Sequence, residues 1–164
     1  MKFAPTKRNV LFISTVVIGV LIDQYSKYWA QSNLIKNEVV SVIDNLLSFK
    51  IMMNTGGALS FGSNHSPLIK GIYFQIIPAL FLLYLIRFIY KNSDFSRLTT
   101  FGAGFAIAGG ISNIIDRLSS SEVVDFILIE KGFLNAVVFN LADVFLIFGI
   151  LITIIGIILN WKKI

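Results

Sequence analysis

The stretch that decides the fold is residues 139–161, which read FNLADVFLIFGILITIIGIILNW. The run is apolar apart from Asn140 and Asp143 near its start, Thr153 further on and Asn160 at its end. A helix needs about 20 mostly apolar residues to cross the hydrocarbon core of a bilayer. We therefore expect a membrane-spanning helix here, with its polar groups gathered near the end where it begins.

Three further stretches have the same length and character, at residues 10–30, 68–90 and 98–118. Of the 164 residues, 55% are hydrophobic and 14% are charged, whereas a soluble domain carries about 25% charged residues. A soluble chain of this size has no core large enough to hide so much apolar surface. The sequence predicts an all-α membrane protein with four transmembrane helices, forming a single integral membrane domain over residues 1–164.

The first apolar run is expected to be retained in the mature protein. Lys2, Lys7 and Arg8 precede it, as they would in a cleavable signal peptide. The run is followed by Asp23-Gln24-Tyr25, however, and a signal peptide would end in a small-x-small cleavage site. We interpret this run as the first transmembrane helix.

Basic residues orient the four predicted helices. With both termini in the cytoplasm, the inner side carries eight basic residues and one acid, and the outer side, helix ends included, carries six basic residues and eight acids. This asymmetry follows the positive-inside rule. The net charge of +5 is therefore explained by membrane topology, and no nucleic-acid partner is expected.

Two outer segments, residues 31–66 and 119–138, join the predicted helices. Residues 39–43 and 46–53 flank Asp44-Asn45, a pattern typical of a β-hairpin. Residues 123–126 are predicted to form a short extended piece. We therefore expect a small extracytoplasmic β-hairpin in the first segment and an extended piece in the second.

The residue inventory excludes several kinds of site. The chain has no cysteine and one histidine, His65, so disulfides and thiolate sites are excluded and a histidine-built metal site is not expected. Neither His-Glu-x-x-His nor Gly-x-Ser-x-Gly occurs. We expect no metal and no organic cofactor.

Polar side chains inside the predicted helices are the candidates for function. An ionisable group in a span costs about 2.5–3.5 kcal/mol on insertion scales, so a retained one needs a role. At about 1.5 Å of rise per residue, these groups all fall in the outer third of the bilayer, and within each helix they share a face or are adjacent. They are Asp23, Lys27, Asn113, Asp116, Arg117, Asn140 and Asp143, with Asp125 on the segment just above.

Each of these residues also has a purely structural interpretation. Asp143 is an acid in the first turn of a helix and Asn140 a helix N-cap. Asp116 and Arg117 would form an interfacial ion pair, and Lys27 would extend to the membrane surface. The common depth of the group nevertheless favours a shared site.

The chemistry that fits such a site is a pair of carboxylates that share one proton and activate a water molecule. Four aspartates are eligible on this argument, namely Asp23, Asp116, Asp125 and Asp143.

Small residues repeat every four positions at Gly102, Ala106 and Gly110, with Gly109 adjacent, and predict close packing of the third helix against a neighbour.

Five motifs, in this order along the chain, resemble those of the lipoprotein signal peptidases, the type II signal peptidases of bacteria. The resemblance covers essentially the full length. The motifs are Asp23-Gln24-Tyr25-Ser26-Lys27, Asn54-Thr55-Gly56, Gly110-Ile111-Ser112-Asn113-Ile114-Ile115-Asp116-Arg117, Val123-Val124-Asp125-Phe126 and Phe139-Asn140-Leu141-Ala142-Asp143. Ser112 and Gly57 depart from the residues usual in the family.

The resemblance implies that Asp125 and Asp143 are the catalytic pair. It implies supporting roles near the site for Asn54, Gly110, Asn113, Arg117 and Asn140, and structural roles behind it for Asp23, Lys27 and Asp116. Asp116 would then hold the guanidinium of Arg117 in place for substrate carbonyls.

The implied function is that of an intramembrane aspartyl endopeptidase. It would remove the signal peptide from a diacylglyceryl-modified prolipoprotein, just before the lipidated cysteine, at the outer face of the bacterial cytoplasmic (inner) membrane. Both termini would be cytoplasmic and the enzyme would act as a monomer, in contact with membrane lipid. Residues 31–66 would form a cradle over the substrate and residues 123–135 a lid.

Two other functions fit parts of the pattern. A small transporter or proton conductor also uses intramembrane Asp, Arg and Asn, but residues 101–107 and 147–158 of the inner halves offer only Thr153 for a polar path. A non-catalytic membrane assembly factor would tolerate both Asp125→Asn and Asp143→Asn.

Overall fold

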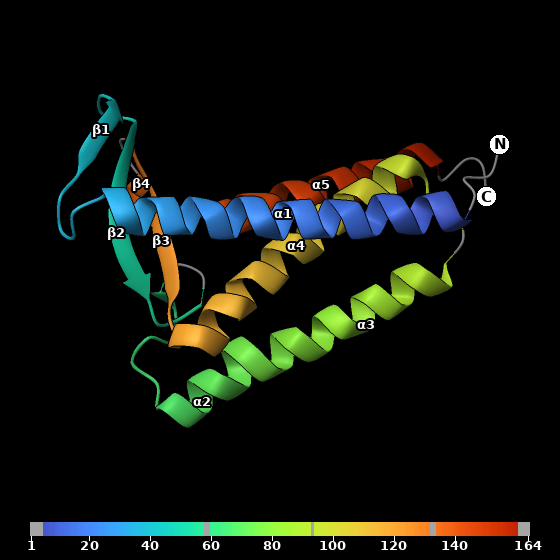
Figure 1. Ribbon diagram of the computed structural model, residues 1–164, viewed down its shortest axis with the longest axis horizontal. Helices are drawn as coiled ribbons and strands as arrows, with labels where there is room; N and C mark the ends of the chain where they lie inside the picture. The colour runs from blue at the N-terminus through green and yellow to red at the C-terminus, as the bar shows by residue number, and fades with distance from the viewer. Residues whose placement is uncertain (1–4, 58–59, 93, 132–133, 161–164) are drawn as a thin grey trace.

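Four long apolar helices make up most of the protein. The computed structural model describes residues 5–57, 60–92, 94–131 and 134–160. The helices are α1 (Pro5–Asn33), a continuous segment Pro67–Lys91, α4 (Arg97–Ser120) and α5 (Leu141–Asn160), and each is long and apolar enough to cross a membrane. They lie along one another, with a β-sheet at one end and both chain termini at the other (Figure 1). The four predicted helices are confirmed, with shifts at their ends.

The start of the fourth helix was predicted two residues too early. Phe139 is the last residue of a strand, and Asn140 caps the helix that begins at Leu141. At the start of α4, the hydroxyl of Ser96 accepts a hydrogen bond from the backbone N–H of Thr99. Capping side chains of this kind fix where a helix begins, which hydropathy alone does not.

The second membrane-spanning segment contains a π-helical turn. It consists of α2 (Pro67–Gly71), η2 (Ile72–Ile76) and α3 (Ile77–Lys91). The π turn lies directly before Pro78, and the backbone N–H of Ile77 donates to the carbonyl of Ile72. Pro78 has no N–H to continue an α-helical pattern, and π turns are frequent near functional sites.

The two segments that join the first helix to the second and the third to the fourth form one antiparallel sheet with the strand order β1-β2-β3-β4. The strands are β1 (Val40–Ile43), β2 (Leu47–Asn54), β3 (Val123–Lys131) and β4 (Leu134–Phe139). The predicted hairpin is confirmed, because β1 pairs with β2 and Asn45 in the connecting turn has a left-handed φ of 56°. Asp125 on β3 lies opposite Met52 on β2.

The extended piece predicted at residues 123–126 is confirmed, but it is longer than expected, because these residues begin the nine-residue strand β3. Residues 123–135 were expected to form a lid, but β3 pairs with a strand on each side and is interior to the sheet; residues 132–133 lie outside the described residues. The sequence hides this strand because its first half is buried on both faces, so apolar and polar residues do not alternate.

Small residues allow α4 and α5 to approach closely. A methyl group at Gly102 would lie 2.6 Å from the backbone nitrogen of Thr153, and one at Gly149 would meet the backbone of Ala106. Gly110, predicted to belong to this stripe, instead faces α3, where a methyl group would lie 2.9 Å from Leu82. The close contact brings the C-terminal half of α4 beside the first turn of α5.

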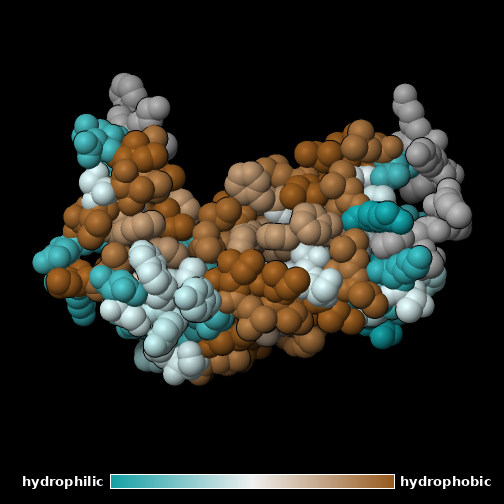
Figure 2. All heavy atoms as spheres, turned by 45° about the horizontal axis from the view of Figure 1, so that its top comes forward, coloured by the Kyte–Doolittle hydropathy of each residue, from teal (hydrophilic) through white to brown (hydrophobic). Residues whose placement is uncertain are grey.

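Apolar side chains cover the outside of the helices. Phe12, Leu82, Ile89, Ala103 and Ile107 form a buried core between α1, α3 and α4. Most other large apolar side chains of the helices are exposed, and Figure 2 shows them as a broad hydrophobic surface over the helical part. This is the pattern of helices surrounded by lipid.

Candidate active site

The two aspartates that the resemblance singled out line the same cavity. Asp125 comes from β3 and Asp143 from the first turn of α5. The cavity has a volume of about 500 Å³. Its polar lining also includes Asn54, Asn113 and Arg117, and its apolar lining comes from Val123 and from residues of β4 and α5.

The carboxylate of Asp125 is buried, with 2% of the residue exposed. Its Oδ1 accepts a hydrogen bond of 2.6 Å from Nδ2 of Asn140, and its Oδ2 accepts one of 3.0 Å from Nδ2 of Asn54. Burial raises the pKa of Asp125 to about 6; the hydrogen bond from Asn54 opposes this shift and the negative charge of Asp143 adds to it. Asp125 therefore titrates closer to neutral pH than an ordinary aspartate does.

Asp143 is held by the amides of two asparagines. Its Oδ1 accepts from Nδ2 of Asn113 at 2.9 Å, and its Oδ2 accepts from the backbone N–H of Asn140 at 3.3 Å. In return, Oδ1 of Asn140 accepts from the backbone N–H of Asp143 at 3.0 Å, which makes Asn140 the predicted N-cap. Asn140 thus contacts both aspartates, Asp125 through its side chain and Asp143 through both its backbone and its side chain.

A buried cation lies behind this pair. The ammonium group of Lys27 is 2.6 Å from Asp23, 2.8 Å from Asp116 and 2.9 Å from Oδ1 of Asn113. The ammonium group thus forms ion pairs with two carboxylates and donates a hydrogen bond to the asparagine oxygen. The prediction that Asp23 and Lys27 share one face of the first helix is confirmed, whereas Lys27 does not extend to the membrane surface. The predicted ion pair between Asp116 and Arg117 is wrong, because Asp116 pairs with Lys27.

Asp23 also ties α1 to the start of α5. Its Oδ1 accepts from the backbone N–H of Ala142 and its Oδ2 from the hydroxyl of Ser112, each at 2.7 Å. Gln24 donates to the hydroxyl of Ser112 at 2.9 Å and to Asp116 at 2.7 Å. Sequence reasoning did not assign a role to Gln24 or Ser112. The i, i+4 spacing of Ser112 and Asp116 was the signal that places both on the face toward α1.

Arg117 is fixed at the edge of the cavity. It donates to the carbonyl of Gly56 at 2.9 Å and to the carbonyl of Asn113 at 3.2 Å. Its guanidinium lies 5.9 Å from the ring centre of Phe74, and Gln75 donates to its backbone carbonyl at 3.1 Å. Phe74 and Gln75 belong to the π turn η2 and lie outside the five motifs, so no pattern predicted a role for them.

Nine of the ten candidate residues therefore belong to one connected polar network. The exception is Gly110, which packs against Leu82 and is not part of the cavity lining. Among the described residues, no group of three His, Cys, Asp or Glu side chains is arranged to hold a metal ion. The arrangement offers two carboxyl groups of separate elements to one cavity, with amides and an arginine beside them.

Comparison with known proteins places this architecture in a family. Residues 15–159 match the peptidase A8 family, signal peptidase (SPase) II. The chain is 37% identical over 155 residues to a lipoprotein signal peptidase of Bartonella henselae, covering 93% of this chain and 91% of the relative. It is 34% identical over 150 residues to that of Enterococcus faecalis, covering 92% and 88%.

Solved structures agree with the sequence relatives. A bacterial membrane enzyme determined by the in meso method at 2.3 Å resolution superposes with a TM-score of 0.78 at 27% identity, over 93% of this chain and 90% of that one. A second, at 1.9 Å resolution, gives a TM-score of 0.75 at 28% identity, over 89% and 91%. The chain belongs to the lipoprotein signal peptidases, the signal peptidase II family, and is a multi-pass membrane protease that cleaves signal peptides from prolipoproteins.

Proposed function

We propose that Asp125 and Asp143 are the catalytic pair of an aspartyl endopeptidase that cuts diacylglyceryl-modified prolipoproteins just before the lipidated cysteine. One observation carries the choice of this pair. Both carboxylates line the same cavity, whereas Asp23 and Asp116 are paired with Lys27 and are absent from its lining. Only the first two are therefore free to meet a substrate and a water molecule together.

The pair would work with one shared proton. The network holds four carboxylates, Asp23, Asp116, Asp125 and Asp143, against two cations, Lys27 and Arg117, so an added proton reduces its net negative charge. The pKa of Asp125, raised to about 6, supports retention of that proton near neutral pH. The two groups would titrate as a unit.

Hydrolysis would follow the course of other two-carboxylate sites. The ionised carboxylate takes a proton from a water molecule while the water oxygen attacks the scissile carbonyl carbon, and the protonated carboxyl gives its proton to the carbonyl oxygen. The tetrahedral intermediate then collapses as the amide nitrogen gains a proton and the C–N bond breaks. No metal or organic cofactor takes part in these steps.

Arg117 would hold substrate carbonyls at the edge of the cavity. Its hydrogen bonds to the carbonyls of Gly56 and Asn113 fix the plane of the guanidinium. Five N–H donors in a rigid fork give such a group two or more directed bonds at once. The supporting roles of Asn54, Asn113 and Asn140 would be to orient the two carboxylates through their amide hydrogen bonds.

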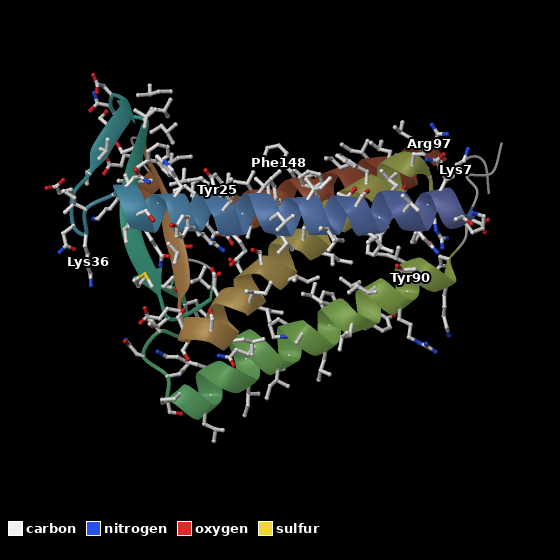
Figure 3. The ribbon with its side chains drawn as sticks, in the orientation of Figure 1. Lys7, Tyr25, Lys36, Tyr90, Arg97 and Phe148 are labelled. Carbon is white, nitrogen blue, oxygen red and sulfur yellow. The ribbon has the colours of Figure 1, made fainter. Side chains whose placement is uncertain are left out.

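The site would lie at the outer face of the bacterial cytoplasmic (inner) membrane, with both termini in the cytoplasm. The sheet and the cavity lie at the end of the helices opposite the termini, and Lys7 and Arg97 lie at the terminal end (Figures 1 and 3). The basic inner end agrees with the positive-inside rule. We propose a monomer as the active form.

The test is cleavage of a synthetic diacylglyceryl-modified precursor peptide by the purified enzyme, compared with the same peptide without lipid. Mass spectrometry of the products gives the position of the cut. The proposal expects a single cut before the modified cysteine, and little or no cleavage of the unlipidated peptide. Equal cleavage of both peptides, or a cut elsewhere, would contradict it.

A further inference from the structure

The cavity is lined by alternate residues of β3 but by consecutive residues of β4. On β3, its lining includes the alternate residues Val123 and Asp125, as expected where a cavity lies under one face of a sheet. On β4, the lining includes three consecutive residues, Val137, Val138 and Phe139. Since successive side chains of a strand point to opposite faces, the cavity must reach β4 along its edge.

This edge of β4 has no neighbouring strand. The sheet order places β4 last, and its register pairs Val137 with Ile129 and Val138 with Leu128 of β3. In an antiparallel pair, every second residue points its N–H and C=O away from the partner strand. Within the described part of the chain, the backbone hydrogen bonds of residues 136–139 go to β3. The outward groups are thus available along the cavity.

The opposite wall is apolar and opens toward the lipid-facing surface. It is formed by Val144, Leu146, Ile147 and Phe148 of α5. Ile147 is 58% exposed and Phe148 is 59% exposed, and Phe148 projects away from the other helices in Figure 3. In Figure 2 the outline of the molecule is indented between the sheet and the helices. A chain entering from the bilayer would therefore have β4 on one side and α5 on the other.

A membrane-embedded substrate needs hydrogen-bond partners for its unwound backbone, and the free edge of β4 provides them. A signal peptide that crosses the membrane as a helix must unwind before a peptide bond reaches two carboxylates. Unwound backbone at the membrane boundary leaves N–H and C=O groups without partners, which is unfavourable. A strand edge satisfies such groups by adding the extended segment to its sheet.

We infer that the segment of the signal peptide preceding the cleavage point binds in extended form along the free edge of β4, as a fifth strand of the sheet. This inference rests on the proposed function. β4 ends at Phe139, directly before Asn140, which contacts both Asp125 and Asp143. A segment paired with β4 is therefore led toward the catalytic pair. Its side chains on one face would pack on Val144 and Ile147.

Hydrogen exchange tests the inference on the enzyme. The Asp125→Asn variant is incubated with the diacylglyceryl-modified precursor peptide, and binding is followed independently by fluorescence anisotropy of a labelled peptide. Bound peptide should slow exchange at least tenfold at those amides of residues 134–139 whose N–H groups point away from β3. The matched control is β1, the opposite edge strand, where exchange should not change. Unchanged exchange in β4 with the peptide bound, or equal slowing in β1, would overturn the inference. Cleavage of the peptide by the variant would instead overturn the proposed function, and mass spectrometry detects it separately.

A series of N-methylated substrates tests the same point on the peptide with the wild-type enzyme. One amide at a time is methylated at successive positions before the scissile bond, each at least two residues away from it. We expect kcat/KM to fall about tenfold at alternate positions and to change little at the positions between them, because only every second amide of a strand faces its partner. An equal effect at all positions, or none, would contradict pairing with β4.

Discussion

The ammonium group of Lys27 donates a hydrogen bond of 2.9 Å to Oδ1 of Asn113. Nδ2 of Asn140 donates to the same oxygen at 3.2 Å, and both contacts orient the asparagine amide, because an ammonium group and an amide NH₂ group can only donate. With Oδ1 turned toward these donors, Nδ2 of Asn113 faces Asp143 and donates to it at 2.9 Å. A residue of the first helix thus helps to orient the amide that a catalytic candidate on the last helix meets.

The Lys27→Met variant should lose both stability and activity. Methionine has a similar length but leaves Asp23 and Asp116 buried without their cation. Removing one partner from a buried ion pair destabilises by about 3–5 kcal/mol. Thermal unfolding in detergent and kcat measured below the unfolding temperature check the two effects. Lys36→Met, at an exposed position, is the control; a stable and fully active Lys27→Met enzyme would show that the buried cation is dispensable.

The Ser112→Ala variant should be less stable by about 1–3 kcal/mol, because Asp23 loses a donor and Gln24 an acceptor in a buried place. The lowered unfolding temperature should be accompanied by a smaller loss of kcat than in Lys27→Met, since the Lys27–Asn113 contact remains. Ser32→Ala, at an exposed position, serves as the control. An unfolding temperature equal to that of the control would remove Ser112 from the account.

The Arg117→Lys variant should lose activity although the charge is kept. The planar guanidinium donates to the carbonyls of Gly56 and Asn113 at once, and an ammonium group does not reproduce this geometry. We expect kcat/KM to fall by about ten- to a hundredfold, which corresponds to one or two directed hydrogen bonds to charged groups. Arg87→Lys, on the exposed surface of α3, is the matched control. Unchanged turnover would exclude Arg117 from the site.

The dependence on pH follows from the raised pKa of Asp125, about 6 against an ordinary 3.8. Activity that needs one proton on the pair should decline above an apparent pKa near 6. Because the folded state binds this proton more tightly than the unfolded state does, the contribution of Asp125 to the free energy of unfolding should fall as the pH rises from about 4 to 6. The slope of unfolding free energy against pH should therefore be more positive in Asp125→Asn than in the wild type over this range; an identical slope would contradict the raised pKa.

The Gly149→Ala variant should lower the unfolding temperature clearly. A methyl group there would collide with the backbone of Ala106 and force α4 and α5 apart. Overpacking of this kind costs about 1–3 kcal/mol. Gly71→Ala is the matched control, because a methyl group at Gly71 has no neighbour within 4 Å. Equal unfolding temperatures for the two variants would show that the close helix contact is not needed.

The helices were predictable because hydropathy and length determine them directly. The strands β3 and β4 were largely missed, since β3 begins in a run that is buried on both faces and resembles any other apolar stretch. The sheet order, which places β4 at an edge beside the cavity, depends on pairing between distant segments. Local patterns carry no information about such pairing.

The sequence predicted which residues belong to the site, but it did not predict which of them contact one another. Nine of the residues assigned from the motifs join one network. The motifs contain Gln24 and Ser112 but indicated no role for them, and they do not include Phe74 or Gln75. The expected pair of Asp116 with Arg117 failed because adjacent helix residues point about 100° apart. Asp116 faces α1 and meets Lys27, whereas Arg117 faces the cavity.

The central claim is that Asp125 and Asp143 act as one catalytic unit. Its most direct test is kcat/KM of purified, folded Asp125→Asn, Asp143→Asn and the double variant with the lipid-modified precursor peptide, and with Asp44→Asn as an exposed control. The account predicts that each single variant loses at least a thousandfold, that the double variant loses no more than either single one, and that Asp44→Asn is unaffected. Cleavage near the wild-type rate by either single variant would contradict it.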